Sequence, residues 1–216
     1  MKQVFLGFAA LLTVSTVVGF AQPKEAVDIT DAQIKEVLKF APPAVDQTLR
    51  VIDMGGYQLS VAIIHRGPTG AAAGGGRGAA GAGRGAAAPG EPCGLKEAPP
   101  GTTPQNVGAI AHDDTVETYV VTSGGGTLVT GGQVVNGRRS PPESEVTKIL
   151  NGPSCFGPVA GNIVKRKVSV GDVIVIPAGV PHGWTDIADH VDYLSIRPDP
   201  KKVLEHGYVN PHISQK

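Results

Sequence analysis

The pattern of apolar positions changes its period once along this chain of 216 residues. Residues 28–40 place apolar side chains at helical spacing, and Thr30 or Asp31 can cap the first turn, which predicts a short amphipathic helix. From residue 47 onward apolar and polar positions mostly alternate, with the period of two that is typical of strands. We therefore expect a β protein preceded by one helix.

The first two alternating runs, residues 47–54 and 57–66, are separated by Gly55-Gly56, which indicates a hairpin. The second run has one mostly apolar face, which we expect to line the protein interior: Tyr57, Leu59, Val61, Ile63 and His65. Further short strands are expected at residues 107–111, 116–122, 127–130, 163–168, 173–176, 182–186 and 192–197. Many short strands joined by glycine turns indicate an all-β sandwich or barrel.

One long stretch, residues 67–105, carries no strand pattern. Glycine is the unusual part of the composition, with 30 residues, and the segment Gly70–Gly90 consists almost entirely of glycine and alanine. Several prolines follow it. This composition predicts a flexible insertion between two strands.

Residues 1–21 have the layout of a secretory signal peptide, with Lys2 ahead of an apolar run and small residues at Gly19 and Ala21. The alternative is an uncleaved membrane anchor. With cleavage, the mature chain is expected to be periplasmic or secreted and to have no membrane contact. The rest of the chain is expected to form three segments: a helical extension (22–46), a barrel (47–197) and a loose polar tail (198–216).

The net charge and the two cysteines restrict the kinds of partner and site that we expect. Nineteen basic and nineteen acidic residues give a formal net charge of zero, which argues against a nucleic-acid-binding surface. In an oxidising compartment Cys93 and Cys155 can form a disulfide, although two free thiols fit the sequence as well. Neither cysteine belongs to a C-x-x-C motif, so a zinc site or a thioredoxin-like site has no support.

The most specific stretch, residues 171–186, is predicted to be a strand, a tight turn and a second strand. In the first strand Val173 and Val175 are expected to point inward. Pro177 and Gly179 suit the turn, because proline removes a ladder donor and glycine permits unusual backbone angles. The second strand places three side chains on one face: His182, Trp184 and Asp186.

A second stretch, residues 112–124, is predicted to accompany the first. Glu117, Tyr119 and Val121 share one face of a strand. His112 ends the preceding strand, so a short turn can bring its imidazole beside Glu117.

Together the two stretches resemble the motifs of the cupin superfamily, and the chain is similar to small secreted bacterial single-domain cupins. The second cupin motif, G-x5-P-x-G-x2-H-x3-N, is matched, with Asp186 in place of the final Asn, at Gly171, Pro177, Gly179 and His182. The first motif, G-x5-H-x-H-x3-4-E-x6-G, is matched at His112, Glu117 and Gly124. Ile110 stands at its first His position and Pro104 at its leading Gly.

The resemblance implies a double-stranded β-helix that holds one divalent ion inside its barrel. Carried onto this sequence, the ligands are His112, Glu117 and His182, a set that suits Fe(II), Mn(II), Ni(II), Cu(II) or Zn(II). His65 is a candidate for the missing histidine, or else a hydrogen-bonded histidine of the core or rim. The alternative for the whole set is a metal-free polar pocket.

Three side chains are expected to line a ligand pocket: Trp184, Tyr119 and His65. Arg197 is expected at the rim of the barrel, in solvent. The function implied by the resemblance is that of an exported metal-binding cupin acting on a small organic molecule by dioxygenase, isomerase or decarboxylase chemistry. The alternative is a non-catalytic cupin that binds a small ligand, with or without metal. Family habit also implies a homodimer.

Overall fold

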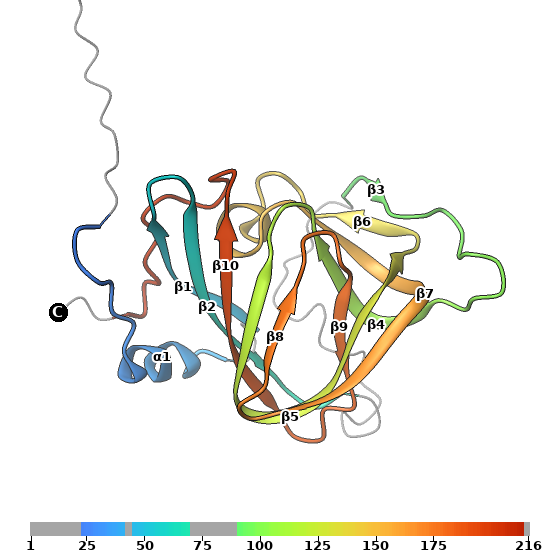
Figure 1. Ribbon diagram of the computed structural model, residues 1–216, viewed down its shortest axis with the longest axis horizontal. Helices are drawn as coiled ribbons and strands as arrows, with labels where there is room; N and C mark the ends of the chain where they lie inside the picture. Colours follow the sequence, from blue (N-terminus) through green and yellow to red (C-terminus); the bar gives the residue numbers. More distant parts are fainter. Residues whose placement is uncertain (1–22, 42–44, 70–89, 214–216) are drawn as a thin grey trace, which may run out of the picture.

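The computed structural model describes residues 23–41, 45–69 and 90–213, and nearly half of these residues lie in antiparallel strands (Figure 1). The predicted signal peptide and residues 70–89 of the Gly/Ala tract lie outside the described residues. The elements, in chain order, are α1 (Asp31–Leu38), β1 (Asp46–Asp53), β2 (Gln58–Arg66), β3 (Pro92–Cys93), β4 (Gln105–His112), β5 (Glu117–Val134), β6 (Gly137–Arg139), the π-helical turn η2 (Val146–Leu150), β7 (Ser154–Ser169), β8 (Val173–Ile176), β9 (His182–Thr185) and β10 (Val191–Asp199).

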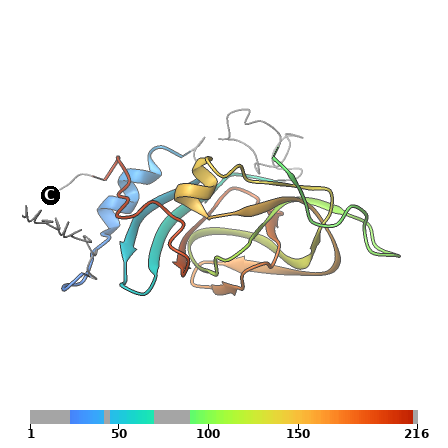
Figure 2. The same ribbon diagram turned by 90° about the horizontal axis from the view of Figure 1, so that it is seen from above.

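The 18-residue strand β5 connects two sheets and makes the fold. Its first half pairs with β10 and β8, and its second half pairs with β7 and β9. The change of sheet falls at Gly124, whose φ of 64° and close approach to the His190 carbonyl leave no room for a Cβ atom. The result is the all-β double-stranded β-helix that the sequence predicts, with the sheets curving around a common interior (Figures 1 and 2).

The interior between the sheets holds an aromatic and aliphatic core. Tyr193 lies at its centre, with the ring of Tyr119 at 4.3 Å and the ring of Trp184 at 5.4 Å between centroids. The buried aliphatic members of the same cluster are Ala62, Ile64, Val121, Leu128, Val168, Ile176, Ile187 and Val191. Trp184 and Tyr119 therefore point into the barrel, as predicted from the strand period.

The predicted inward face of β2 is wrong. Ala62 and Ile64 face the interior, whereas Val61 and Ile63 belong to a separate core on the other side of the sheet. Both faces of β2 carry buried residues, because α1 covers the second core, and the inner face includes the polar Gln58 and Ser60. Alternation of apolar and polar residues therefore did not identify the inner face. His65 consequently lies on the outer side with Val61 and Ile63.

The same correction applies to β8. Val173 and Val175 are each 63% exposed, whereas Ile174 and Ile176 face the core. Every position of this four-residue strand is β-branched and apolar, so its period could not reveal which face is buried.

α1 packs beside β1 and β2 (Figures 1 and 2). Its first turn carries a capping box, in which Thr30 and Gln33 exchange side-chain and backbone hydrogen bonds. Val37 of α1 is fully buried and packs against Leu49 and Ile63. The C-terminal tail, predicted to be loose, packs here too, because Ile213 belongs to the same core.

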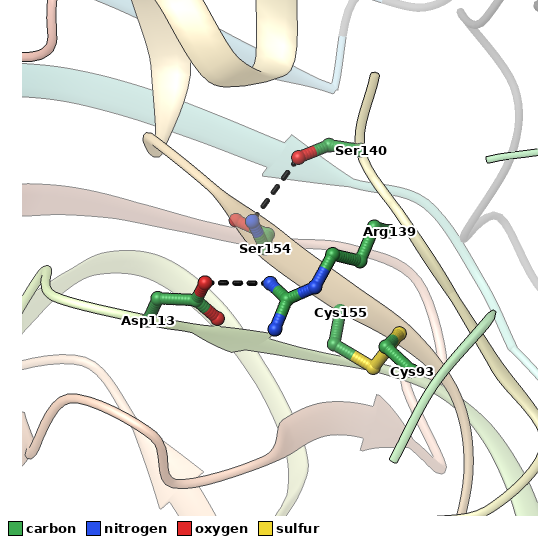
Figure 3. Close-up of a disulfide and its surroundings, with 6 residues drawn as sticks. All are labelled: Cys93, Asp113, Arg139, Ser140, Ser154 and Cys155. Carbon is green, nitrogen blue, oxygen red and sulfur yellow. Dashed lines mark hydrogen bonds and ion pairs between the residues drawn. A yellow bond between two sulfur atoms is a disulfide. The ribbon is translucent and has the colours of Figure 1, made fainter. Parts of the chain in front are cut away.

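The stretch predicted as a featureless insertion contains a short strand. β3 pairs with β6, and a disulfide joins Cys93 of β3 to Cys155 of β7 (Figure 3). The two cysteines are 62 residues apart in sequence, so local pattern carried no sign of this strand. Two further differences concern length: the runs predicted at residues 116–122 and 127–130 form the single strand β5, and β7 begins nine residues before its predicted start at residue 163.

Among the described residues, no helix combines the length and apolar character needed to cross a membrane.

Candidate metal centre

The ends of three strands bring three predicted ligands together inside the barrel. His112 is the last residue of β4, Glu117 the first of β5 and His182 the first of β9. Each is at most 3% exposed. One ligand atom from each residue lies within 4.8 Å of the other two. The turn at Gly179 supports this arrangement, because its N–H donates to the His112 carbonyl at 2.7 Å.

Both imidazoles approach the same carboxylate oxygen. Nε2 of His182 lies 2.9 Å from Oε2 of Glu117, and Nε2 of His112 lies 3.2 Å from it. The two rings are 5.1 Å apart between centroids and tilted by 58°. The cluster thus presents two ring nitrogens and one oxygen to a common point.

The tautomer of His182 follows from its other ring nitrogen. Nδ1 lies 3.0 Å from the carbonyl oxygen of Val180, which can only accept, so Nδ1 carries the proton and donates it. In the neutral ring Nε2 is then a bare lone pair. This buried atom has no hydrogen-bond partner, despite its 2.9 Å contact with Glu117.

His112 is held in the same way by Ser154 of β7. The Ser154 hydroxyl donates its only proton to the Gly152 carbonyl at 2.9 Å, so it accepts from Nδ1 of His112 at 2.8 Å. Ser154 is fixed by its own backbone N–H, which donates to Ser140 (Figure 3). The neutral His112 ring therefore also directs an Nε2 lone pair at Glu117.

The second oxygen of Glu117 is occupied by other donors. The Ser195 hydroxyl donates to Oε1 at 2.9 Å and Nε of Arg197 donates at 2.7 Å. Tyr119 donates to Oε2 at 2.8 Å. Arg197 extends to Asp46 with both terminal nitrogens, at 3.2 and 2.8 Å.

The electrostatics keep the histidine neutral and the carboxylate ionised. Burial lowers the pKa of His112 below its ordinary value, although the charge of Glu117 opposes this. Burial would raise the pKa of Glu117, but the charge of Arg197 opposes it, and that pKa is held well below its usual range. Burial, followed by the charge of Glu117, raises the pKa of Tyr119 well above its usual value, so this phenol remains a donor.

A cation fits this donor set. Two Nε2 lone pairs and an ionised carboxylate oxygen point toward one another with no positive group between them. These three atoms repel one another unless a proton or a metal ion lies among them. Two imidazoles and one carboxylate are ligands that divalent transition metals accept. The non-ligating atoms are engaged by Val180, Ser154, Ser195 and Arg197, which is the usual support of a metal site.

His65 does not belong to the cluster, and its prediction as a substitute ligand and pocket residue is wrong. Nδ1 of His65 pairs with Asp192 at 2.6 Å, and a quarter of the side chain is exposed. The ring stacks on His190, with centroids 6.0 Å apart. The cause is the inverted face of β2, which turns His65 outward.

The remaining predicted residues lie as follows. Trp184 and Tyr119 are buried in the barrel, and the indole Nε1–H of Trp184 has no hydrogen-bond partner. Gly171 and Gly179 occupy turns with φ values of 91° and 76°, where a side chain would be strained. Pro177 precedes Gly179 in its turn and accepts a hydrogen bond from the Val180 N–H.

Arg197 is the main residue that sequence reasoning misplaced. It was expected in solvent at the rim, but it is 1% exposed and bound to Glu117. The period of β10 indicated the opposite face, because Ser195 and Arg197 alternate with the apolar Leu194 and Ile196, yet Ser195 and Arg197 are the buried residues. Ser154 carried no signal either, because its role depends on the pairing of β4 with β7.

Comparison with known proteins found solved structures of low similarity. No family model and no curated protein matches this chain. A solved structure titled an uncharacterized conserved protein with a double-stranded beta-helix domain, from Klebsiella pneumoniae, is 13% identical, with 82% of this chain and 94% of that chain covered and a TM-score of 0.37. A Bacillus halodurans protein is 14% identical, with 88% and 93% covered and a TM-score of 0.39.

A structure of oxalate oxidase is 15% identical, with 75% of this chain and 55% of that chain covered and a TM-score of 0.34. Similarity at this level transfers no activity. What the strand pairing and the side chains themselves establish is a double-stranded β-helix protein with a buried His112/Glu117/His182 cluster.

Proposed function

We propose that this protein binds one divalent transition-metal ion through Nε2 of His112, Oε2 of Glu117 and Nε2 of His182, and acts there on a small organic molecule. The observation that carries the proposal is the buried Nε2 of His182, a lone pair without a hydrogen-bond partner that faces an ionised carboxylate. A metal ion satisfies both atoms at once.

Three protein ligands leave coordination positions open for a substrate. When bound, the ion supplies Lewis-acid polarisation or redox chemistry at those positions. The chain itself contributes a carboxylate held ionised by Arg197, which donates to Oε1, and a phenol at Tyr119, which donates to Oε2. Dioxygenase, isomerase and decarboxylase reactions on small molecules all suit such a site.

The test is metal analysis of protein loaded separately with Fe(II), Mn(II), Ni(II), Cu(II) and Zn(II) and then dialysed. We expect one ion per chain to be retained for at least one of these metals. H182A and E117Q should lose it, whereas the control H190A should retain it, because His190 lies outside the cluster. Wild-type protein that retains none of the five metals would overturn the proposal.

A second candidate is a non-catalytic protein that binds a small ligand. The observation that favours it is the indole N–H of Trp184, a buried donor without a partner in the aromatic interior. Trp184 is the only tryptophan of the chain, so its fluorescence reports this site alone. Oxygen uptake with catechols or diketones indicates an enzyme, whereas fluorescence quenching without turnover indicates a binding protein.

Export and self-association are also proposed. The apolar segment before residue 21 and the Cys93–Cys155 disulfide support an oxidising compartment outside the cytoplasm. The exposed Val173 and Val175 on β8 support a homodimer. Mass determination of the mature protein tests the first proposal, and sedimentation equilibrium tests the second.

A further inference from the structure

We infer that Arg197 is a positioning residue for the metal ligand Glu117: it occupies Oε1, so that Glu117 offers the ion one oxygen, Oε2. The inference rests on the proposed metal site and adds to it the residue that sets how the carboxylate binds. It concerns a side chain outside both motifs, 80 residues from Glu117 in sequence.

The geometry on the Glu117 side is that of a divided carboxylate. Nε of Arg197 and the hydroxyl of Ser195 both donate to Oε1, at 2.7 and 2.9 Å. Oε2 is the oxygen that lies near the two imidazoles. A carboxylate can bind an ion through one oxygen or both. Here Oε1 is held by two donors, whereas Oε2 accepts from the Tyr119 hydroxyl and faces both imidazoles.

The geometry on the far side of Arg197 prevents it from moving away. Its two terminal nitrogens grip Asp46 of β1 at 3.2 and 2.8 Å, and Nη1 also donates to the Leu150 carbonyl of η2 at 3.0 Å. The planar guanidinium is therefore fixed by contacts from three elements. Lysine, a point charge on a flexible stem, cannot reproduce this set.

Arg197 also places a positive charge next to the carboxylate that it positions. Its Nε lies 2.7 Å from Oε1 of Glu117, and both side chains are at most 2% exposed. The guanidinium therefore compensates the charge of Glu117 without a proton, which leaves Oε2 available to an ion.

The test compares R197M, R197K and a matched control, R66M. Arg66 is also a guanidinium on the inner face of a strand, but its Nε donates to Tyr193 and not to Glu117. Two measurements are made: the Zn(II) dissociation constant by chelator competition, and the infrared difference spectrum between Zn-loaded and metal-free protein. The gap between the two carboxylate stretching bands distinguishes one-oxygen from two-oxygen binding.

We expect R197M to weaken Zn(II) binding by about 10- to 100-fold, as loss of a supporting contact to a metal ligand usually does. It should also narrow the gap between the carboxylate bands, because Oε1 becomes free to bind the ion. R197K should restore part of the affinity, and R66M should match the wild type in both measurements.

If R197M does not fold, D46N takes its place in the test, because it loosens the same guanidinium without removing it. We expect the Zn(II) affinity of D46N to lie between that of the wild type and the roughly 10- to 100-fold weaker affinity expected for R197M. Folded R197M or D46N with wild-type affinity and a wild-type band gap would overturn the inference. Failure of the metal proposal is distinct, since the wild-type protein itself would then bind no Zn(II) and give no difference spectrum.

Discussion

At the scale of single residues, a neighbouring group holds each candidate ligand through the atom that points away from the proposed ion position. Val180 accepts from His182, Ser154 accepts from His112, and Arg197 donates to Glu117. These contacts set two tautomers and one ionisation state before any metal arrives. The site is therefore built as a set of lone pairs. Burial lowers the pKa of His112 even though the charge of Glu117 opposes it.

This protonation state predicts how the metal-free protein responds to acid. The pKa of His112 is lowered from 6.5 in the fold, so below pH 6.5 the unfolded chain takes up the proton first and stability falls. Because the pKa of Glu117 is also lowered in the fold, Glu117 lowers the free energy of unfolding too, but only below its ordinary pKa of 4.5. Between pH 6.5 and 5, His112 should therefore lower the free energy of unfolding by up to about 1.4 kcal/mol per pH unit.

Urea denaturation of metal-free protein at several pH values measures this loss. Between pH 6.5 and 5, the free energy of unfolding of H112Q should decline less steeply with falling pH than that of the wild type. The difference in slope should be at most that of one proton, about 1.4 kcal/mol per pH unit. The control H190Q changes a histidine outside the cluster and should leave the His112 contribution in place. Equal slopes for H112Q and wild type would show that His112 is not the titrating group.

At the scale of elements, strand ends create the site. β4 ends at His112 and β5 begins at Glu117, and Ile110 of β4 pairs directly with His182 of β9. Most strand positions were predictable because turn glycines and apolar periods are local, but β3, β6 and the first part of β7 were missed. The inner face of a strand was not predictable where both faces are buried, as in β2, or where every residue is apolar, as in β8. The predicted inner residues of both strands, including His65, therefore lie on the outer face.

The corrected face of β8 predicts the cost of mutations in it. V175T replaces an exposed side chain by one of similar shape, and we expect a change of no more than about 0.5 kcal/mol in the free energy of unfolding. I176A removes a side chain that is 2% exposed and should cost about 2–5 kcal/mol. Urea denaturation of both variants at two protein concentrations provides the comparison.

Two outcomes of this experiment are informative beyond the expected one. A cost for V175T that depends on protein concentration would mean that a second copy of the chain covers this face. A cost as large as that of I176A at every concentration would mean that Val175 is buried within the chain, and the assigned face of β8 would be wrong.

At the scale of the whole molecule, the contacts that sequence could not predict are those between distant segments. Glu117 and His182 were predictable because each belongs to a short motif. The bond from Arg197 to Asp46 joins residues 151 apart, and the disulfide of Cys93 joins β3 to β7. Such pairs depend on strand order and register, which no local pattern carries.

Cys155 of the disulfide is the neighbour of Ser154 (Figure 3), and Ser154 in turn holds His112. C93S/C155S opens a loop of about 60 residues and should lower the free energy of unfolding by about 2–4 kcal/mol in urea. Zn(II) affinity should stay within about threefold, because Ser140 and the Gly152 carbonyl still fix Ser154. If the affinity instead fell tenfold or more while the variant remained folded, the disulfide would itself be part of the support of the metal site.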